Sequence, residues 1–168
     1  MIMANQTFAM SYPEKRTFFL EGSELLKSDT QTVYTRSITN PLGALKYINQ
    51  GDKSSTYLLQ ATDTDSPYLA AGQYRSFKGN AGKSKVTIGR YKRNLGNKSH
   101  IGLIATNRDF QIGGSGSVVE LDSLINFLDD YILDLNVSRS DTQEGNVNFL
   151  ETEDTFAGRT YAMDGESI

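Results

Sequence analysis

The stretch Lys85-Val-Thr-Ile-Gly-Arg-Tyr-Lys92 predicts one β-strand, because its apolar and polar residues alternate as in a half-buried strand. Turn residues follow it in Asn94-Leu-Gly-Asn97, and Asn80-Ala-Gly82 precedes it. These positions fit consecutive hairpins, so we expect an antiparallel β-meander. Strands of the same kind are predicted at Thr17–Leu20, Thr32–Ile38, Thr56–Ala61, Gln73–Lys78, Ile101–Thr106 and Val118–Leu121.

Two helices are predicted beside these strands. Asp122–Leu135 carries apolar residues at three- and four-residue spacing, which places them on one stripe of an amphipathic helix with Asp122 as its cap. Pro41–Asn49 suits a short helix that begins after Asn40 and ends before Gly51. The expected fold class is mainly β (α+β), a meander backed by one C-terminal helix. The stripe of that helix has two candidate partners, its own sheet and a second copy of the chain.

The length of 168 residues suits one compact domain with an extension. We expect a β-rich domain over residues 1–136 and a flexible acidic tail over 137–168, where the apolar pattern stops. The chain has no cysteine, which excludes disulfides, zinc knuckles and thiol nucleophiles. No apolar run is long enough to span a membrane, and no signal peptide precedes the first strand, so a cytoplasmic location is expected.

The charges are divided along the chain. Residues 1–119 hold 15 of the 17 basic and 8 of the 20 acidic residues, a balance of +7, whereas residues 120–168 hold 2 basic and 12 acidic ones, a balance of −10. Eight basic residues fall within the 24 residues from Arg75 to Lys98 without an acidic residue between them. Such an uneven distribution indicates a surface for an anionic partner.

Aromatic residues are interleaved with these basic ones, a combination that single-stranded nucleic acid requires. Cations neutralise phosphates, and aromatic faces stack on unpaired bases. A solvated, basic strand edge that discourages aggregation is the alternative interpretation. Within one strand Arg90 and Lys92 share a face while Tyr91 points to the other, so only one of these sets belongs in a groove. The predicted nucleic-acid-binding residues are Tyr74, Arg75, Phe77, Lys78, Lys83, Lys85, Arg90, Tyr91, Lys92, Arg93 and Lys98.

Motifs for catalysis and cofactors are incomplete in this sequence. Gly79-Asn-Ala-Gly82-Lys83-Ser84 ends like a phosphate-binding loop but has Phe77 where the first glycine belongs, and Gly113-Gly-Ser-Gly116 lacks the context of a dinucleotide site. The single His100 is interpreted as an ordinary strand histidine. We expect no catalytic residues, no cofactor and no metal site. A metal-dependent hydrolase or nuclease using Asp52, Asp63 or Asp65 is retained as a minor alternative.

The order of strands over Gln73–Lys78, Lys85–Lys92, Ile101–Thr106 and Val118–Leu121, followed by Asp122–Leu135, resembles the ββββα unit of single-stranded DNA-binding proteins of the Whirly, PUR and transcriptional-coactivator type. The acidic C-terminal part is similar to that of phage and bacterial single-stranded DNA-binding proteins, which commonly have an OB-fold. That second resemblance implies a tail that recruits partner proteins or competes with DNA. Residues 17–70 have no counterpart in one ββββα unit.

The sequence therefore predicts a non-enzymatic protein that binds single-stranded nucleic acid without strict sequence preference. Only the family resemblance favours DNA over RNA. A different class of function is kept open: a structural or protein-interaction module, such as a virion component or an inhibitor. That module would have no affinity for nucleic acid.

Overall fold

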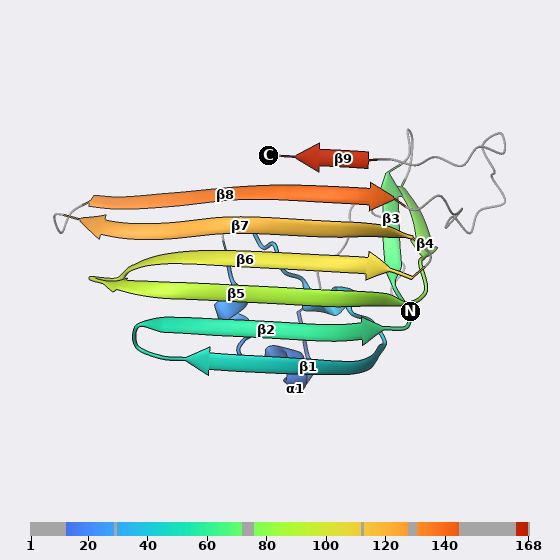
Figure 1. Ribbon diagram of the computed structural model, residues 1–168, viewed down its shortest axis with the longest axis horizontal. Coiled ribbons are helices and arrows are strands. Elements are labelled where there is room, and N and C mark those ends of the chain that lie inside the picture. The colour runs from blue at the N-terminus through green and yellow to red at the C-terminus, as the bar shows by residue number, and fades with distance from the viewer. Residues whose placement is uncertain are drawn as a thin grey trace.

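The computed structural model describes residues 13–28, 30–71, 76–111, 113–127, 131–144 and 164–167. These ranges form one large antiparallel sheet and a separate two-stranded ribbon (Figure 1). The ribbon pairs β3 (Pro67–Ala71) with β4 (Ser76–Asn80). The strand order across the large sheet is β1-β2-β5-β6-β7-β8-β9, with β1 at Pro41–Gln50, β2 at Ser54–Asp63, β5 at Ser84–Gly96, β6 at Ser99–Phe110, β7 at Gly114–Phe127, β8 at Tyr131–Glu144 and β9 at Asp164–Ser167.

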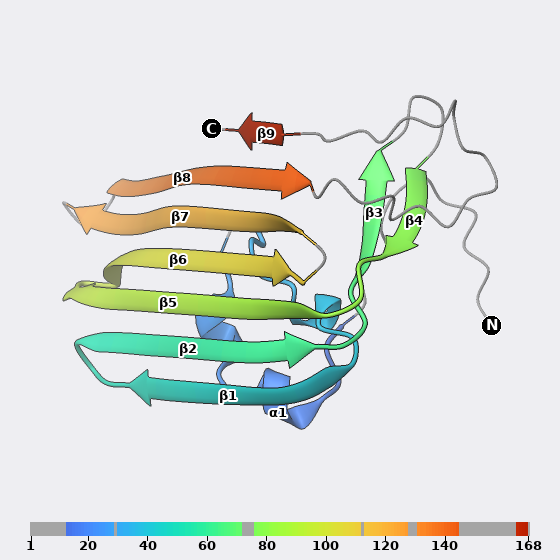
Figure 2. The same ribbon diagram turned by 45° about the vertical axis from the view of Figure 1, so that its right-hand side comes forward.

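The central part of the sheet is a meander, which confirms the expected antiparallel topology. β5, β6, β7 and β8 each pair with the next strand in the sequence, and β1 and β2 form a hairpin. Between β2 and β5 the chain leaves the sheet and forms β3 and β4, which stand across the end of the large sheet (Figure 2). The turn at Asn94–Asn97 is the predicted hairpin, because β5 pairs with β6 there.

The N-terminal segment packs on one face of the sheet. It contains the short helix α1 (Thr17–Leu20) and the 3₁₀ turns η1 (Ser23–Leu26) and η2 (Thr35–Ser37), and it lies behind β1 and β2 in Figure 1. Burial along β2 follows the strand period, since Tyr57 and Leu59 are buried while Leu58 between them is half exposed. We call the face with Tyr57 the covered face and the face with Leu58 the open face. The core on the covered face consists of Phe19, Leu26, Ile38, Tyr57, Leu59, Ala61, Val86 and Ile88.

The predicted helix over Asp122–Leu135 is wrong. Residues 122–127 are the end of β7, and residues 131–135 are the start of β8, which pairs antiparallel with β7. The apolar residues that suggested one helical stripe lie on two faces of a strand pair, because Leu121 and Ile125 share the open face while Leu124 lies on the covered face. A strand with apolar residues on both faces produces three- and four-residue spacings without any helix.

Several other predicted elements differ from the structure. Pro41–Asn49 is strand β1 instead of a helix, and Thr17–Leu20 is helix α1 instead of a strand. The predicted strand at Thr32–Ile38 contains the 3₁₀ turn η2. Residues 80–82 do not close a hairpin, because β4 pairs with β3 and β5 pairs with β2. The remaining predicted strands fall within or overlap β2, β4, β5, β6 and β7.

The expected flexible tail over 137–168 is wrong for its first part. Residues 137–144 belong to β8 and pair with β7, and residues 164–167 form β9 on the outer edge of β8. Residues 145–163 and 168 lie outside the described ranges. None of the described helices has the length and apolarity that a membrane-crossing helix needs.

Candidate interaction surfaces

The predicted basic and aromatic residues do not gather in one groove. Along β5 the side chains alternate, so Lys85, Tyr91 and Arg93 lie on the open face while Arg90 and Lys92 lie on the covered face. The other predicted residues occupy different parts of the molecule. Lys83 precedes β5 and Lys98 follows it, at opposite ends of a strand of 13 residues. Phe77 and Lys78 belong to β4, and Tyr74 and Arg75 lie outside the described residues.

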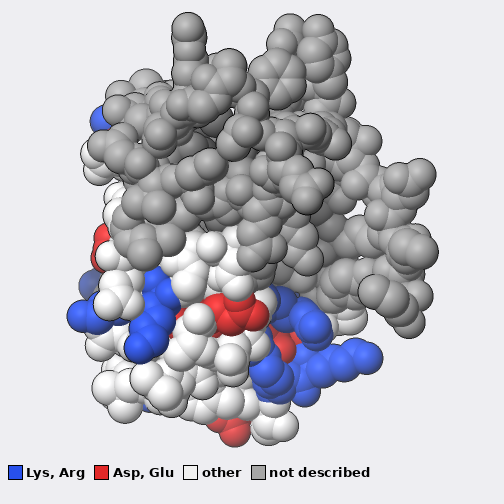
Figure 3. All heavy atoms as spheres, turned by 90° about the vertical axis from the view of Figure 1, so that its right-hand side faces the viewer, with Lys and Arg blue, Asp and Glu red and all other residues white. Residues whose placement is uncertain are grey.

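Charges of both signs also meet at the end of the sheet where β2 ends and β5 begins. Figure 3 shows Lys and Arg side chains there on either side of a group of acidic ones. Lys85 itself lies opposite Asp109 of β6 on the open face. The described part of this end is therefore not a continuous basic track for a phosphate backbone.

Arg90 is a structural residue, which corrects its prediction as a phosphate contact. Arg90 is 3% exposed, and its guanidinium donates two hydrogen bonds to Asp122 of β7, one of them from Nη2 to Oδ2 at 2.8 Å. Burial alone would raise the pKa of Asp122, but the hydrogen bonds from Arg90 lower it below its usual value. Nε of Arg90 has no hydrogen-bond partner among the described residues, but it is buried with the rest of the guanidinium, so this group is not exposed to a phosphate.

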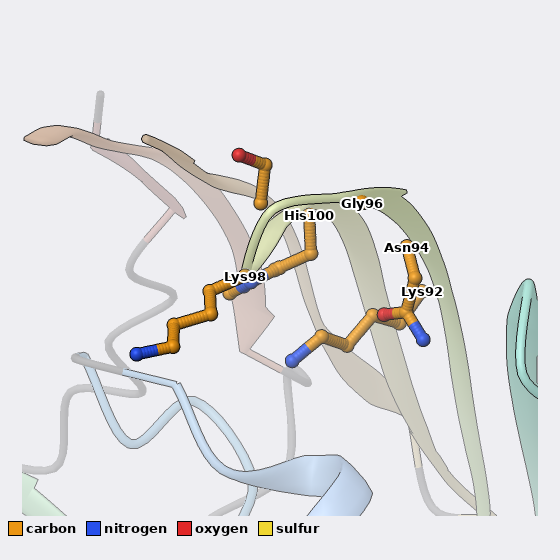
Figure 4. A pocket seen from close by; sticks show the side chains of 6 residues that line it. Lys92, Asn94, Gly96, Lys98 and His100 are labelled. Atoms are coloured by element: carbon orange, nitrogen blue, oxygen red, sulfur yellow. The ribbon is translucent and has the colours of Figure 1, made fainter. Parts of the chain in front are cut away.

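The turn between β5 and β6 encloses an open hollow of about 350 Å³ (Figure 4). Asn97 and Lys98 shape the turn with φ values of 46° and 58°. His100 Nε2 lies 3.4 Å from Asp122 Oδ2, and burial together with the nearby charge of Lys92 lowers the pKa of His100. Two of the predicted binding residues, Lys92 and Lys98, line this hollow, and two ammonium groups beside an imidazole suit a small anion. Its lining residues are Lys92, Asn94, Gly96, Lys98, Ser99 and His100.

The carboxylates proposed for a metal-dependent enzyme do not form a site. Asp63 is fully buried and accepts hydrogen bonds from the backbone N–H groups of Thr39 and Asn40 and from Nη2 of Arg108 at 2.9 Å. Burial lowers the pKa of Arg108 in this cluster. Asp63 therefore fixes the N-terminal segment to the sheet. In the part of the chain that the structure describes, no three acidic or histidine side chains are grouped as metal ligands.

Glu120 is a third buried carboxylate of the covered face, beside Asp63 and Asp122, and no sequence pattern indicated its role. It is 0% exposed, and its Oε2 accepts hydrogen bonds from the hydroxyls of Ser28, Thr30 and Thr32. Asn136 of β8 donates to Oε1 at 2.7 Å. Glu120 thus joins the N-terminal segment to β7 and β8, which explains its burial without assigning it a chemical function.

The open face carries an apolar surface that extends across six strands, from β1 to β8. Strand register aligns Tyr91, Leu103, Leu121 and Val137 in one row from β5 to β8. These four residues are 46%, 44%, 47% and 61% exposed. The next row, one step closer to the N-terminal end of β5, holds Tyr47, Leu58, Gly89, Ala105 and Val119.

This apolar surface has a polar boundary on one side. The row after Gly89 and Ala105 is polar from β2 to β8 and ends at Leu45 in β1, and the row beyond it contains Lys85 and Asp109. The polar members of the first row are Gln60, Thr87, Asn107, Ser117 and Asp141. An exposed apolar patch with a polar rim is typical of a protein–protein interface. We define the apolar surface as Leu45, Tyr47, Leu58, Tyr91, Ile101, Leu103, Val119, Leu121, Phe127, Tyr131, Leu133, Leu135 and Val137.

The size of this surface sets it apart from ordinary surface hydrophobics. Each member is at least 40% exposed. Because roughly half of each large side chain is exposed to water, the exposed apolar area of the surface is on the order of 1,000 Å². The largest apolar patch of a typical monomer is about 300–600 Å². The sequence contained a signal for it: Ile101, Leu103 and Ile104 place apolar residues on both faces of β6, which indicates a sheet that is buried on both sides.

Comparisons with protein-family models, with curated proteins and with solved structures found no match. The functional interpretation therefore depends on the geometry of the described residues.

Proposed function

We propose that this protein is a non-enzymatic structural or protein-interaction module that works through the open face of its sheet. The observation that supports this function is the apolar surface, which crosses β5, β6, β7 and β8 and ends at a polar row. No catalytic constellation accompanies it among the described residues, and Asp63, Glu120 and Asp122 are each used in internal hydrogen bonds.

The free energy available from covering this surface is large. Removing about 1,000 Å² of apolar area from water contributes roughly 25 kcal/mol at 25 cal/mol per Å². Lost rigid-body freedom and side-chain ordering offset most of that amount. The remainder is enough for a stable protein complex, and a protein surface of matching shape is the partner that can cover a broad, nearly flat sheet face.

Two neighbouring residues of β6 test this function. Leu103 is 44% exposed on the open face, and Ile104 is fully buried on the covered face. We expect Leu103→Thr to change the free energy of unfolding by less than about 1 kcal/mol and to lower the binding of an apolar fluorescent dye. Ile104→Thr should cost about 2–4 kcal/mol, because it places a hydroxyl in the core. The free energy of unfolding and the fluorescence of the bound dye are measured for both variants and for the wild type at low protein concentration.

The contrary result is equally clear. If Leu103→Thr destabilises the protein as much as Ile104→Thr, and the wild type binds no dye, the open face is part of the core of the same chain. The proposed function is then wrong.

Binding of single-stranded nucleic acid is a second candidate, favoured by one observation. Tyr91 is 46% exposed and shares the open face of β5 with Lys85 and Arg93. A stacking ring with cations on both sides along a strand suits unpaired bases and phosphates. Partner recruitment by the acidic C-terminal part belongs to this candidate.

A salt-dependent anisotropy titration with labelled oligo-dT tests this candidate, with duplex DNA and oligo-U as comparisons. Tight, salt-sensitive binding that Tyr91→Ala and Arg93→Ala weaken supports it. An absence of binding at low salt removes it.

A further inference from the structure

We propose that the partner of the open face is a second copy of this chain, so that two sheets pack face to face as a sandwich. This inference rests on the proposed function and names its partner. Face-to-face packing of sheets about 10 Å apart is the usual way to bury two apolar sheet faces. The covered face already has its own layer, the N-terminal segment, so the sandwich adds a layer only on the open side.

The area fits a homodimer. Each copy contributes on the order of 1,000 Å², so a pair removes about 2,000 Å² from water. A standard complex buries about 1,600 Å² in total, and permanent homodimers begin near 2,000 Å². Homodimer interfaces are also the more apolar class. The aliphatic side chains in the middle of the open face, Leu58, Leu103, Val119 and Leu121, match that composition.

The middle of the open face has a local step that fits a second copy of the chain. Tyr91 and Leu103 lie directly beside the small residues Gly89 and Ala105 of the adjacent row, whose other members include the larger Leu58 and Val119. A two-fold axis that runs between these two rows places Tyr91 and Leu103 of each copy over Gly89 and Ala105 of the other. A closed dimer needs this self-complementarity, because the same patch serves both partners.

Gly89 has no steric need to be small within one chain. A Cβ built there would meet Leu58 Cδ2 at 3.6 Å, an ordinary contact, and its φ is not in the left-handed region. The space above Gly89 is therefore free to serve packing from outside the protomer. Glycine within a strand often marks a place where another chain approaches closely.

The charges agree with a protein partner more than with nucleic acid at this surface. Arg93 and Arg139 lie at its edges, and the apolar rows between them contain no other charged residue among the described ones. A face with so few cations lacks the phosphate contacts that nucleic-acid affinity depends on. The polar row with Asn107 and Asp141 limits how far the two sheets overlap.

The test uses the full chain in light scattering coupled to size exclusion, between about 1 and 100 μM. The chain mass is 18.6 kDa, so the dimer is expected near twice that value. Leu103→Glu places carboxylates of both copies in the apolar interface and should raise the dissociation constant at least about 100-fold. Asn107→Glu is the matched control, because Asn107 lies on the same strand and the same face but in the polar row. It should leave the dimer intact.

A second variant and a dye measurement separate the outcomes. Leu121→Glu, on β7, should act like Leu103→Glu, and circular dichroism must show that both remain folded. A wild-type monomer at 100 μM that binds apolar dye overturns the dimer and leaves the proposed function standing with a different protein partner. A monomer that binds no dye overturns both. A dimer that persists in both glutamate variants also overturns the proposal and points to pairing through the outer edge of β1.

Discussion

Arg90 of β5 and Asp122 of β7 form a two-pronged ion pair that crosses β6 directly over Gly102. Nη2 of Arg90 lies 2.8 Å from Oδ2 of Asp122, and Nη1 donates to Oδ1. Register places Gly102 between them, opposite Lys92 on one side and Asp122 on the other. His100 contacts the same carboxylate. The pair therefore connects three strands at the hairpin end of the covered face, and through His100 it is linked to the hollow beside the β5–β6 turn.

Removal of one partner of this pair should be costly. Asp122→Ala leaves the Arg90 guanidinium, 3% exposed, without its counter-ion. We expect a loss of about 3–5 kcal/mol in the free energy of unfolding, because an unpaired buried charge is strongly unfavourable. Urea denaturation measures it. Asp109→Ala, at an exposed carboxylate opposite Lys85, should cost less than about 1 kcal/mol. Equal losses of unfolding free energy in the two variants would show that burial of the ion pair does not set the cost of removing its carboxylate.

Gly102 is required because the guanidinium occupies the space above it. A Cβ at this position would lie 2.6 Å from Nη1 of Arg90 and 2.7 Å from Oδ1 of Asp122. Gly102→Ala should destabilise the protein by about 1–3 kcal/mol, as over-packing of a buried position does. Gly116→Ala is the control, since a Cβ there meets nothing within 4 Å. Thermal or chemical denaturation that ranks the two variants in the opposite order would show that the ion pair can move aside.

Glu120 should hold the N-terminal segment on the sheet. Glu120→Ala removes the buried carboxylate that accepts from the hydroxyls of Ser28, Thr30 and Thr32, and with it the hydrogen bonds between the segment and β7. We expect a loss of about 3 kcal/mol and faster amide exchange in that segment. Glu21→Ala, at a carboxylate with a 66% exposed side chain, is the control and should leave exchange at residues 30–32 unchanged. Unchanged exchange in Glu120→Ala would mean that the apolar core alone holds the segment.

The strands with clean alternation were predictable, whereas elements whose structure depends on tertiary packing were not. β5 and β6 have turn residues between them, so the sequence locates both and their hairpin. β7 and β8 have apolar residues on both faces, which imitates a helical stripe when the end of one strand and the start of the next are read as one element. The predicted strand at Thr17–Leu20 is a helix of one turn that packs Phe19 into the core. Four residues are too few for their pattern to distinguish a strand from a helical turn.

The candidate surface was less predictable than the strands. Local sequence shows that Arg90 and Lys92 share one face of β5, but it does not show that Asp122, 32 residues later, neutralises Arg90. The same limit applies to the open face, because its rows are formed by register between strands that are far apart in the sequence. The count of charges along the chain therefore predicted one basic surface, whereas the fold distributes these residues over two faces and both ends of β5.

His100 provides a pH-dependent readout of the hollow beside the β5–β6 turn. It is the only histidine of the chain, so its NMR signals need no separate assignment. Burial first, and then the charge of Lys92, lowers its pKa below the ordinary value of 6.5. The unfolded chain therefore binds the proton more readily than the folded one. The contribution of His100 to stability is fully present above pH 6.5, and it is lost as the pH falls from there through the lower pKa of the folded state.

Substitution of Lys92 separates its effect on the pKa of His100 from the effect of burial. Lys92→Ala should raise the pKa of His100 toward 6.5, because it removes a nearby positive charge while the burial persists. Lys85→Ala is the matched control: Lys85 is on the same strand but on the open face, so the pKa of His100 should not move. NMR titration of the imidazole protons in the three proteins makes the measurement. A wild-type pKa at or above 6.5, or equal effects of the two lysine variants, would show that Lys92 does not face the imidazole in solution.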